Sequence, residues 1–263
     1  MNNVELLTQS IRLATVIQQM YDLPDGQNNV DGYKALDVSA SGFDIFDVML
    51  ADELGYKDVP VGLLVTDLST GDDEATFRGT RVVLNGPNEW AVDVQALMRR
   101  STLGVDGVWA HYGFDSSFAS FHRLSCRPMP PLKRVSGHSL AGAWALELAT
   151  LLRCNCISFA GPRLFNRAGA LYADLAIPEL VRWVNMPDLV PDVPLTVWPF
   201  LDYQHVGPSS TFDSTKVCPD PVDPDPFREI ALRITHWHAL TTYKAVLQSA
   251  LDQLIASASP STS

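Results

Sequence analysis

Basic residues are in short supply in this chain. Its 263 residues include 19 Lys and Arg against 30 Asp and Glu, for a formal net charge of −11 at pH 7. Because binding to the phosphates of DNA or RNA needs a basic surface, we expect no nucleic-acid partner. No continuous apolar run is long enough to cross a bilayer, so the sequence predicts no transmembrane segment.

The N-terminus lacks the basic region and continuous apolar run of a signal peptide. Residues 1–21 instead carry apolar side chains at helical spacing, which predicts an amphipathic helix. The apolar positions are Val4, Leu7, Ile11, Ala14 and Ile17. As written, the sequence favours a cytoplasmic protein, and a processed start would leave export open.

The four cysteines lack the spacing of a zinc site. Cys154 and Cys156 lie two residues apart, and neighbouring positions on one strand bridge poorly in a disulfide. We therefore expect buried free thiols at these two positions and at Cys126 and Cys218. The sequence implies no metal and no organic cofactor.

Neither an internal repeat nor a break in composition divides the chain. With 46% hydrophobic residues it can bury a full core, which favours one domain over residues 1–263, with a frayed tail at 256–263. Strands alternate with helices, and this pattern predicts an α/β fold with a mainly parallel sheet flanked by helices. Expected strands are 59–67, 74–77, 105–111, 156–160 and 180–184, and expected helices are 90–100, 114–124, 140–153 and 238–255.

The most informative stretch is Gly-His-Ser-Leu-Ala-Gly at residues 137–142. An extended run precedes it and a helix of small residues follows, so Ser139 is expected on a sharp turn between a strand and a helix. That position exposes the hydroxyl beside the N–H groups of a helix N-terminus. The usual signature has glycine two residues after the serine, where this chain has Ala141.

A serine nucleophile needs a base and an acid that orients the base. In α/β-hydrolases these follow in the order Ser, Asp or Glu, His. Asp188 comes directly after the predicted strand 180–184, and His238 stands where the last helix begins. Two rivals lie close by in the sequence, Asp192 and His236.

Further blocks around these positions make the chain resemble the class 3 lipases, the family of the fungal triacylglycerol lipases. In family order they are Thr-Phe-Arg-Gly-Thr at 76–80, Trp90 with Asp93, His-Tyr-Gly-Phe at 111–114, the elbow at 137–142, 158–163, 185–191, 203–207 and 238–243. The resemblance implies an α/β-hydrolase fold. It also favours His238 over His236, because the family's His-x-x-x-x-Tyr pattern begins at His238.

The resemblance assigns roles residue by residue. Ser139 would be the nucleophile, Asp188 the orienting acid and His238 the base. The backbone N–H groups of Thr80 and Leu140 would form the oxyanion hole. His205 would be a structural histidine, and the side chain of His138 would point away from Ser139.

The lid of the fungal relatives would fall at residues 81–88. Gly86 and Pro87 would break a helix there, so any cover is expected to be short. Val82, Val83 and Leu84 are candidates for an apolar flap or for acyl contacts, with an ordinary loop as the alternative. His111 is a candidate for the pocket wall.

These residues predict a carboxylic ester hydrolase that cleaves acyl esters, acylglycerols above all, by way of an acyl-enzyme. The partner would be a lipid or a small acyl ester, with transient contact to a lipid interface. A feruloyl-type esterase on the same scaffold is one alternative. A non-catalytic member that binds lipid or protein is another, supported only by Ala141. Oligomeric state cannot be read from the sequence.

Overall fold

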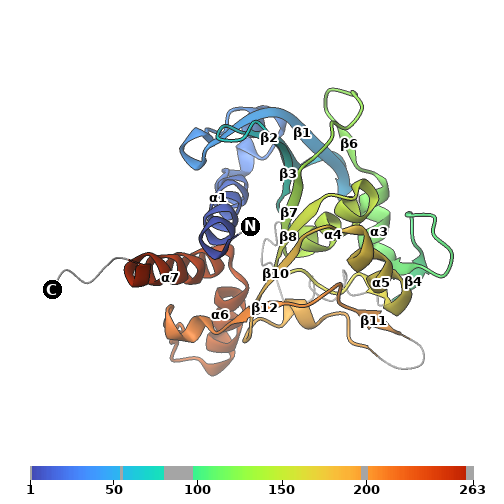
Figure 1. Cartoon of the computed structure of the whole chain (residues 1–263). Helices are drawn as coiled ribbons and strands as arrows, with labels where there is room; N and C mark the ends of the chain where they lie inside the picture. The colour runs from blue at the N-terminus through green and yellow to red at the C-terminus, as the bar shows by residue number, and fades with distance from the viewer. Residues whose placement is uncertain (1, 54–55, 80–96, 197–200, 259–263) are drawn as a thin grey trace.

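A computed structural model describes residues 2–53, 56–79, 97–196 and 201–258, and an eight-stranded sheet runs through them in the order β12-β10-β8-β7-β3-β2-β1-β6 (Figure 1). The strands are β1 (Phe43–Glu53), β2 (Tyr56–Asp67), β3 (Asp73–Phe77), β6 (His122–Arg123), β7 (Arg134–His138), β8 (Asn155–Phe159), β10 (Leu180–Asn185) and β12 (Ser210–Phe212).

Five neighbouring strands of the sheet are parallel. β12, β10, β8, β7 and β3 pair in parallel, whereas β2, β1 and β6 extend the sheet by antiparallel pairing. Parallel neighbours need crossover connections, and α4 lies in the connection from β7 to β8 and α5 in that from β8 to β10. The α-helices are α1 (Asn3–Asp22), α2 (Val30–Lys34), α3 (Tyr112–Ala119), α4 (Leu140–Leu152), α5 (Arg167–Ala176), α6 (Pro226–His238) and α7 (Leu240–Ala258).

A second, four-stranded sheet has the order β11-β9-β5-β4. Its strands are short: β4 (Met98–Arg100), β5 (Trp109–His111), β9 (Phe165–Asn166) and β11 (Tyr203–Gln204). β9 follows β8 closely in the chain, so this small sheet continues from the carboxyl edge of the large one.

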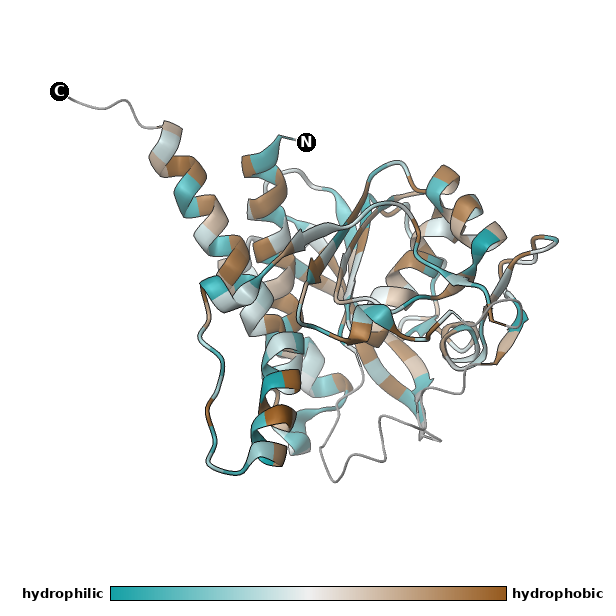
Figure 2. Cartoon of the chain, turned by 90° about the horizontal axis from the view of Figure 1, so that it is seen from below, coloured by the Kyte–Doolittle hydropathy of each residue, from teal (hydrophilic) through white to brown (hydrophobic). Residues whose placement is uncertain are grey.

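Helices cover both faces of the large sheet, and each face has its own apolar core. α1 and α7 lie on one face, and α3, α4 and α5 lie on the other (Figure 1). Successive side chains of β2 point to opposite faces of the sheet. Leu63 and Val65 therefore belong to the core that contains α1, and Leu64 belongs to the core that contains α4. In Figure 2, α1 and α7 alternate between hydrophobic and hydrophilic positions, as helices with one buried face do.

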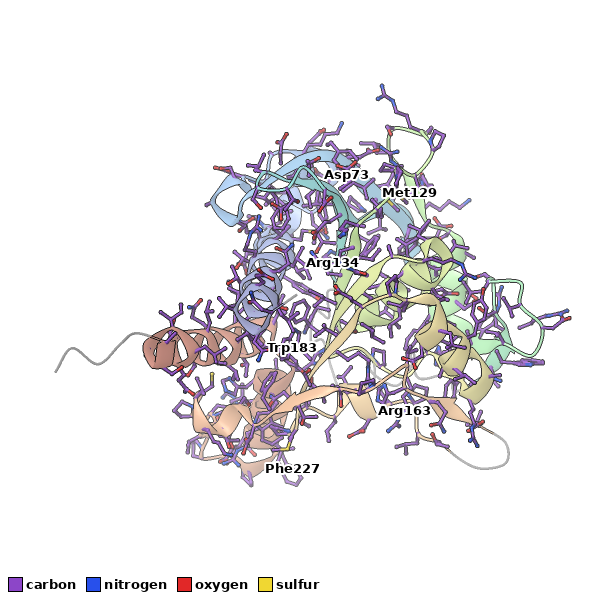
Figure 3. The ribbon with its side chains drawn as sticks, viewed as in Figure 1. Asp73, Met129, Arg134, Arg163, Trp183 and Phe227 are labelled. Carbon is purple, nitrogen blue, oxygen red and sulfur yellow. The ribbon has the colours of Figure 1, made fainter. Side chains whose placement is uncertain are left out.

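Helix α1 is fastened at its start and along its buried face. Asn2 and Glu5 form a reciprocal capping box that satisfies N–H groups of the first turn. Farther along, the indole Nε1–H of Trp183 on β10 donates to Ser10 Oγ at 3.0 Å (Figure 3). Among the described residues, no helix is long and apolar enough to cross a membrane.

The mainly parallel α/β architecture is confirmed, as are the strand pair β2–β3 and the strand–helix–strand unit β7–α4–β8. Three predictions were wrong in part. Of the expected strand 105–111, only Trp109–His111 form a strand, β5. Residues 98–100 of the expected helix 90–100 form strand β4, and the helix expected over 114–124 ends at Ala119 and is followed by β6. In these two helices local helical spacing was overridden by pairing with another strand, β5 in the first and β1 in the second.

Some elements of the structure were not expected from the sequence. β1 and α6 were not expected, and His238 is the last residue of α6 instead of the first of the closing helix. Cys154 and Cys156 are buried free thiols as expected, whereas Cys126 is exposed and Cys218 is half-buried. Residues 256–258 of the predicted tail instead form the end of α7. The predicted lid at 81–88 and residues 259–263 of the tail lie outside the described residues.

A buried pair of acidic side chains joins α3 to α4. Asp115 on α3 is bound by Arg99 at 2.8 Å, and Glu147 on α4 accepts a hydrogen bond from Thr102 Oγ1 at 2.9 Å. Both acids are fully buried. Burial, and next the neighbouring Asp115, raise the pKa of Glu147 well above its ordinary value.

We expect this arrangement to make the folded protein less stable as pH rises. Because the pKa of Glu147 is raised in the folded state, protonated Glu147 adds to the free energy of unfolding. This contribution is complete below the ordinary Glu pKa of 4.5 and is lost as pH increases through the raised pKa. Within that pH window the free energy of unfolding falls by about 1.4 kcal/mol per pH unit, because one proton is involved. The Glu147→Gln variant keeps a neutral group at this position that can still bind Thr102. Its Tm should therefore fall less than that of the wild type as pH rises, and the difference in Tm between the two should widen.

Thermal unfolding across a series of pH values measures this effect. Glu229→Gln on the surface helix α6 is the control, because it removes the same formal charge from a site without a buried acidic neighbour. Parallel Tm profiles for wild type and Glu147→Gln would contradict the prediction.

Candidate active site

Ser139 stands on the sharp turn between β7 and α4. Its backbone has φ 60° and ψ −133°, a conformation that is unfavourable for a residue with a Cβ. Two hydrogen bonds hold it: Ser139 N–H donates to Phe159 O on β8 at 2.9 Å, and Gly142 N–H donates to Ser139 O at 2.8 Å. The surrounding structure thus maintains a strained turn that presents the hydroxyl at the carboxyl end of β7.

Two glycines allow strand and helix to meet at this turn. A Cβ on Gly137 would lie 2.0 Å from Ala141 O, and one on Gly142 would lie 2.7 Å from the Cα of Gly161. Ala141 itself is buried in the first turn of α4 and is not among the residues with positive φ. The close approach to the neighbouring strand is therefore made by Gly142, and alanine fits at position 141.

The structure brings Ser139, His238 and Asp188 into one hydrogen-bonded row. His238 Nε2 lies 2.8 Å from Ser139 Oγ, and His238 Nδ1 lies 2.9 Å from Asp188 Oδ2. These residues come from the elbow after β7, the end of α6 and the loop after β10. The Asp188 side chain is fully buried, and the side chain of His238 is 11% exposed.

Several donors converge on the carboxylate of Asp188. Tyr243 O–H donates to Oδ2 at 2.8 Å, and Val190 N–H donates to Oδ1 at 3.0 Å. These bonds, together with that from His238, satisfy a buried charge that would otherwise be costly. They also leave the carboxylate one orientation, with Oδ2 toward the imidazole.

Asn185 and Tyr243 fasten the loop and the helices around this acid. Asn185 Nδ2 donates to Trp237 O at 2.9 Å, next to His238, and Asn185 N–H donates to Tyr243 Oη at 3.1 Å. Burial, followed by the charge of Asp188, raises the pKa of Tyr243 well above its ordinary value, so its hydroxyl remains a donor. Sequence reasoning gave neither residue a role, although both belong to quoted motifs.

His138 points away from Ser139, as expected, and contacts the backbone of the base. Its Nε2 lies 2.9 Å from His238 O, and its Nδ1 lies 3.0 Å from Tyr21 Oη on α1. The two imidazole rings are 4.9 Å apart with an interplanar angle of 31°. Burial, and next the neighbouring His238, hold the pKa of His138 well below its ordinary value.

The rival residues have other partners. Asp192 is 65% exposed at its side chain and pairs with Arg163 at 3.1 Å. His205 Nδ1 lies 2.6 Å from Arg182 Nη2, which agrees with a structural role. His236 lies two positions before His238 on α6, and no hydrogen bond joins its side chain to Ser139 or Asp188 among the described residues.

His111, the candidate for the pocket wall, ends β5 and caps α3. Its ring stacks on Phe114 at 4.0 Å, and burial lowers its pKa to about 4, so it is neutral at pH 7. Tyr203 of β11 lies 5.9 Å away between ring centroids. Within the described residues, no hydrogen bond joins His111 to Ser139, His238 or Asp188.

Of the two predicted oxyanion donors, the described residues include Leu140 and not Thr80. Leu140 is the first residue of α4, where backbone N–H groups have no intrahelical acceptor. Thr80 lies outside the described residues, and so do Val82, Val83 and Leu84, the candidates for the lid or for acyl contacts. The described chain reaches Gly79, which lies against the elbow: a Cβ there would be 2.7 Å from His138 O.

The architecture is that of solved fungal lipases. A mutant form of MDLA from Penicillium cyclopium is 24% identical over 80% of this chain and 81% of its own, with a TM-score of 0.58. Mono- and diacylglycerol lipase from Aspergillus oryzae is 22% identical over 80% and 79%, with a TM-score of 0.56. Lipase II from Rhizopus niveus is 21% identical over 79% and 80%, with a TM-score of 0.56. No curated protein matches the chain.

The parallel sheet, its flanking helices and these structural likenesses define an α/β-hydrolase. Residues 75–198, which include the elbow and Asp188, match the family model for lipase (class 3). Over these residues, a little under half of the chain, the protein is similar to the class 3 lipases, and it is an ester hydrolase of the lipase type.

Proposed function

We propose that this protein hydrolyses carboxylic acyl esters, acylglycerols above all, through an acyl-enzyme on Ser139. The observation that carries the proposal is the row from Ser139 Oγ through His238 to Asp188, with separations of 2.8 and 2.9 Å. Such a row is suited to remove a proton from a hydroxyl during attack on a carbonyl.

The hydrogen bonds specify the protonation state that the reaction needs. The Asp188 carboxylate can only accept, so His238 Nδ1 carries a proton and Nε2 is free to accept the Ser139 proton. The strained turn places the hydroxyl at a helix N-terminus, where Leu140 N–H would bind the developing oxyanion. Thr80 would supply the second donor.

Acylation then follows from this geometry. Ser139 Oγ attacks the ester carbonyl carbon while its proton passes to His238 Nε2. The tetrahedral intermediate collapses, the bond from carbon to the alkoxy oxygen breaks, and His238 returns the proton to the leaving alcohol. Asp188 stabilises the imidazolium throughout these steps.

Deacylation repeats the sequence with water. Water gives a proton to His238 Nε2 and attacks the acyl carbonyl, and the bond to Ser139 Oγ breaks. His238 then returns that proton to Ser139, and the carboxylic acid leaves. No step requires a redox partner.

A fluorophosphonate probe tests the nucleophile directly. We expect one covalent adduct per chain, mapped to the peptide that contains Ser139 by mass spectrometry. Hydrolysis of p-nitrophenyl esters from acetate to palmitate, beside methyl ferulate and a diacylglycerol, identifies the ester class. We expect acyl esters and the diacylglycerol to be cleaved faster than the ferulate.

Three results would count against the proposal. An adduct at another serine would remove Ser139 from its role. Absence of both labelling and hydrolysis in a folded protein would favour a non-catalytic binding member, and a preference for methyl ferulate would favour the aromatic esterase.

A further inference from the structure

A chain of hydrogen bonds runs from the end of β3 through helix α1 and the elbow to the catalytic base. Gly79 N–H donates to Tyr21 Oη at 2.7 Å, Tyr21 Oη lies 3.0 Å from His138 Nδ1, and His138 Nε2 lies 2.9 Å from His238 O. The last two contacts join residues 117 and 100 positions apart in the sequence. The side chains of Ser139 and Asp188 take no part in this chain.

The chemistry of the groups at its two ends fixes the direction of every proton. The carbonyl of His238 can only accept, so His138 Nε2 carries the hydrogen. Because His138 is neutral, its Nδ1 is then an acceptor, and the hydroxyl of Tyr21 is the donor that reaches it. The amide of Gly79 can only donate, so Tyr21 Oη accepts from it. All donors therefore point from Gly79 toward His238.

The position of His238 explains what such a chain accomplishes. His238 is the last residue of α6, and the final carbonyls of a helix have no intrahelical partner. Much of α6 lies on the surface, where Phe227 is 84% and Ile230 is 57% exposed (Figure 3). His138 Nε2–H satisfies the carbonyl of the base from the interior of the protein, and its ring supports the imidazole ring at 4.9 Å.

The other end of the chain acts on the segment that leads to the predicted oxyanion donor Thr80. Gly79 is packed between the elbow and helix α1: a Cβ on it would lie 2.9 Å from Ser139 Cβ and 2.9 Å from Tyr21 Oη. The hydroxyl of Tyr21 thus touches the backbone directly before Thr80 and, through His138, the backbone of the base.

We propose that Tyr21 and His138 are positioning residues. They hold His238 and Gly79, which directly precedes the predicted oxyanion donor Thr80, in a fixed position relative to each other. This inference rests on the proposed function, because their relative position matters only for a reaction that uses both parts. A neutral His138 suits the role, since a charged ring at this distance would oppose formation of the His238 imidazolium.

Tyr21→Phe is the principal test, because it removes one hydroxyl and keeps the ring. We expect kcat for a p-nitrophenyl ester to fall about 3- to 10-fold, the equivalent of one net hydrogen bond, with KM changed less than 2-fold. The loss belongs in kcat because alignment of base and oxyanion donors is used in the transition state and not in substrate binding.

Tyr33→Phe is the matched control. Tyr33 is fully buried, Tyr21 is half-buried, and the Tyr33 hydroxyl accepts a hydrogen bond from Arg78 Nε at 2.5 Å, one residue before Gly79. It should lower Tm by an amount similar to Tyr21→Phe and leave kcat unchanged. An equal loss of kcat in both variants would show that general loosening of this segment is responsible, and the inference would be overturned.

Two substitutions at His138 test the direction of the protons. His138→Gln retains an amide donor where Nε2–H lies, whereas His138→Leu retains none. We expect His138→Gln to keep several-fold more kcat than His138→Leu. Equal activity of the two variants would contradict a role for the bond to His238 O.

Nitrogen NMR of the histidine rings separates this inference from the proposed function, because it needs no turnover. In the wild type, His138 should carry its hydrogen on Nε2 and should not titrate near pH 7, and Tyr21→Phe should shift the Nδ1 signal. The other tautomer at His138 would overturn the inference even in an active enzyme. An inactive wild type with the expected tautomer would instead overturn the proposed function and leave the hydrogen-bond chain intact.

Discussion

Replacement of Ser139 with alanine is expected to lower kcat for ester hydrolysis by about 10⁴- to 10⁶-fold, because it removes the hydroxyl that lies 2.8 Å from His238 Nε2. The loss should appear in kcat, since the side chain of Ser139 acts on the carbonyl carbon in the transition state. Fluorophosphonate labelling should disappear with it. Initial rates on p-nitrophenyl butyrate and on a diacylglycerol measure the effect.

Ser139→Gly provides a matched comparison for the same position. Both variants lack the hydroxyl, so both should be inactive. The backbone at φ 60° and ψ −133° strains any residue with a Cβ by about 1–3 kcal/mol, and glycine removes that strain at an entropic cost of about 0.5–1 kcal/mol. We therefore expect a higher Tm for Ser139→Gly than for Ser139→Ala.

The activity measurement and the Tm measurement test different claims. Ester hydrolysis by Ser139→Ala at more than a few per cent of the wild-type rate would mean that another group attacks the ester. A Tm for Ser139→Gly below that of Ser139→Ala, with both inactive, would leave the nucleophile in place and refute only the claim that the turn is strained.

The sequence could predict that Ser139, His238 and Asp188 lie together because each lies in a local motif. Ser139 lies within Gly-His-Ser-Leu-Ala-Gly, and Asp188 directly follows an apolar strand. His238 could be chosen over His236 only through the family pattern. Local spacing could not do this, because both histidines lie near the end of α6.

The supporting contacts could not be found in the same way. Tyr21 reaches His138 across 117 positions, and residues 1–21 predicted only an amphipathic helix. The distance in sequence hides the contact, since no local pattern specifies which residue of α1 faces the elbow. Asn185 and Tyr243 were within reach, because each occupies a fixed place in a motif that also holds a catalytic residue.

The fold was predicted best where hydrophobic pattern and chain connectivity agree. The unit β7–α4–β8 combines an apolar strand, a small-residue helix and a second apolar strand, and nothing in it competes with that assignment. β1 was not predicted because Phe43–Glu53 mixes acidic and apolar residues and has three register shifts along its length, which blur the two-residue alternation. α6 was not predicted because several prolines lie just before it and are typical of a loop, although Pro226 suits the first turn of a helix.

His238→Gln and His236→Gln are expected to differ in kcat by at least about 10³-fold, although they change the same residue type two positions apart on one helix. Gln at 238 cannot take up the proton of Ser139, so general-base catalysis is lost. Gln at 236 leaves the row of Ser139, His238 and Asp188 untouched, and its kcat should stay within about 3-fold of wild type.

Initial rates on p-nitrophenyl butyrate measure this difference. The activity should depend on position 238, since no other histidine contacts Ser139 among the described residues. If His236→Gln lost the activity while His238→Gln kept it, the base would be His236, and the geometry at the end of α6 would have to differ from that described here.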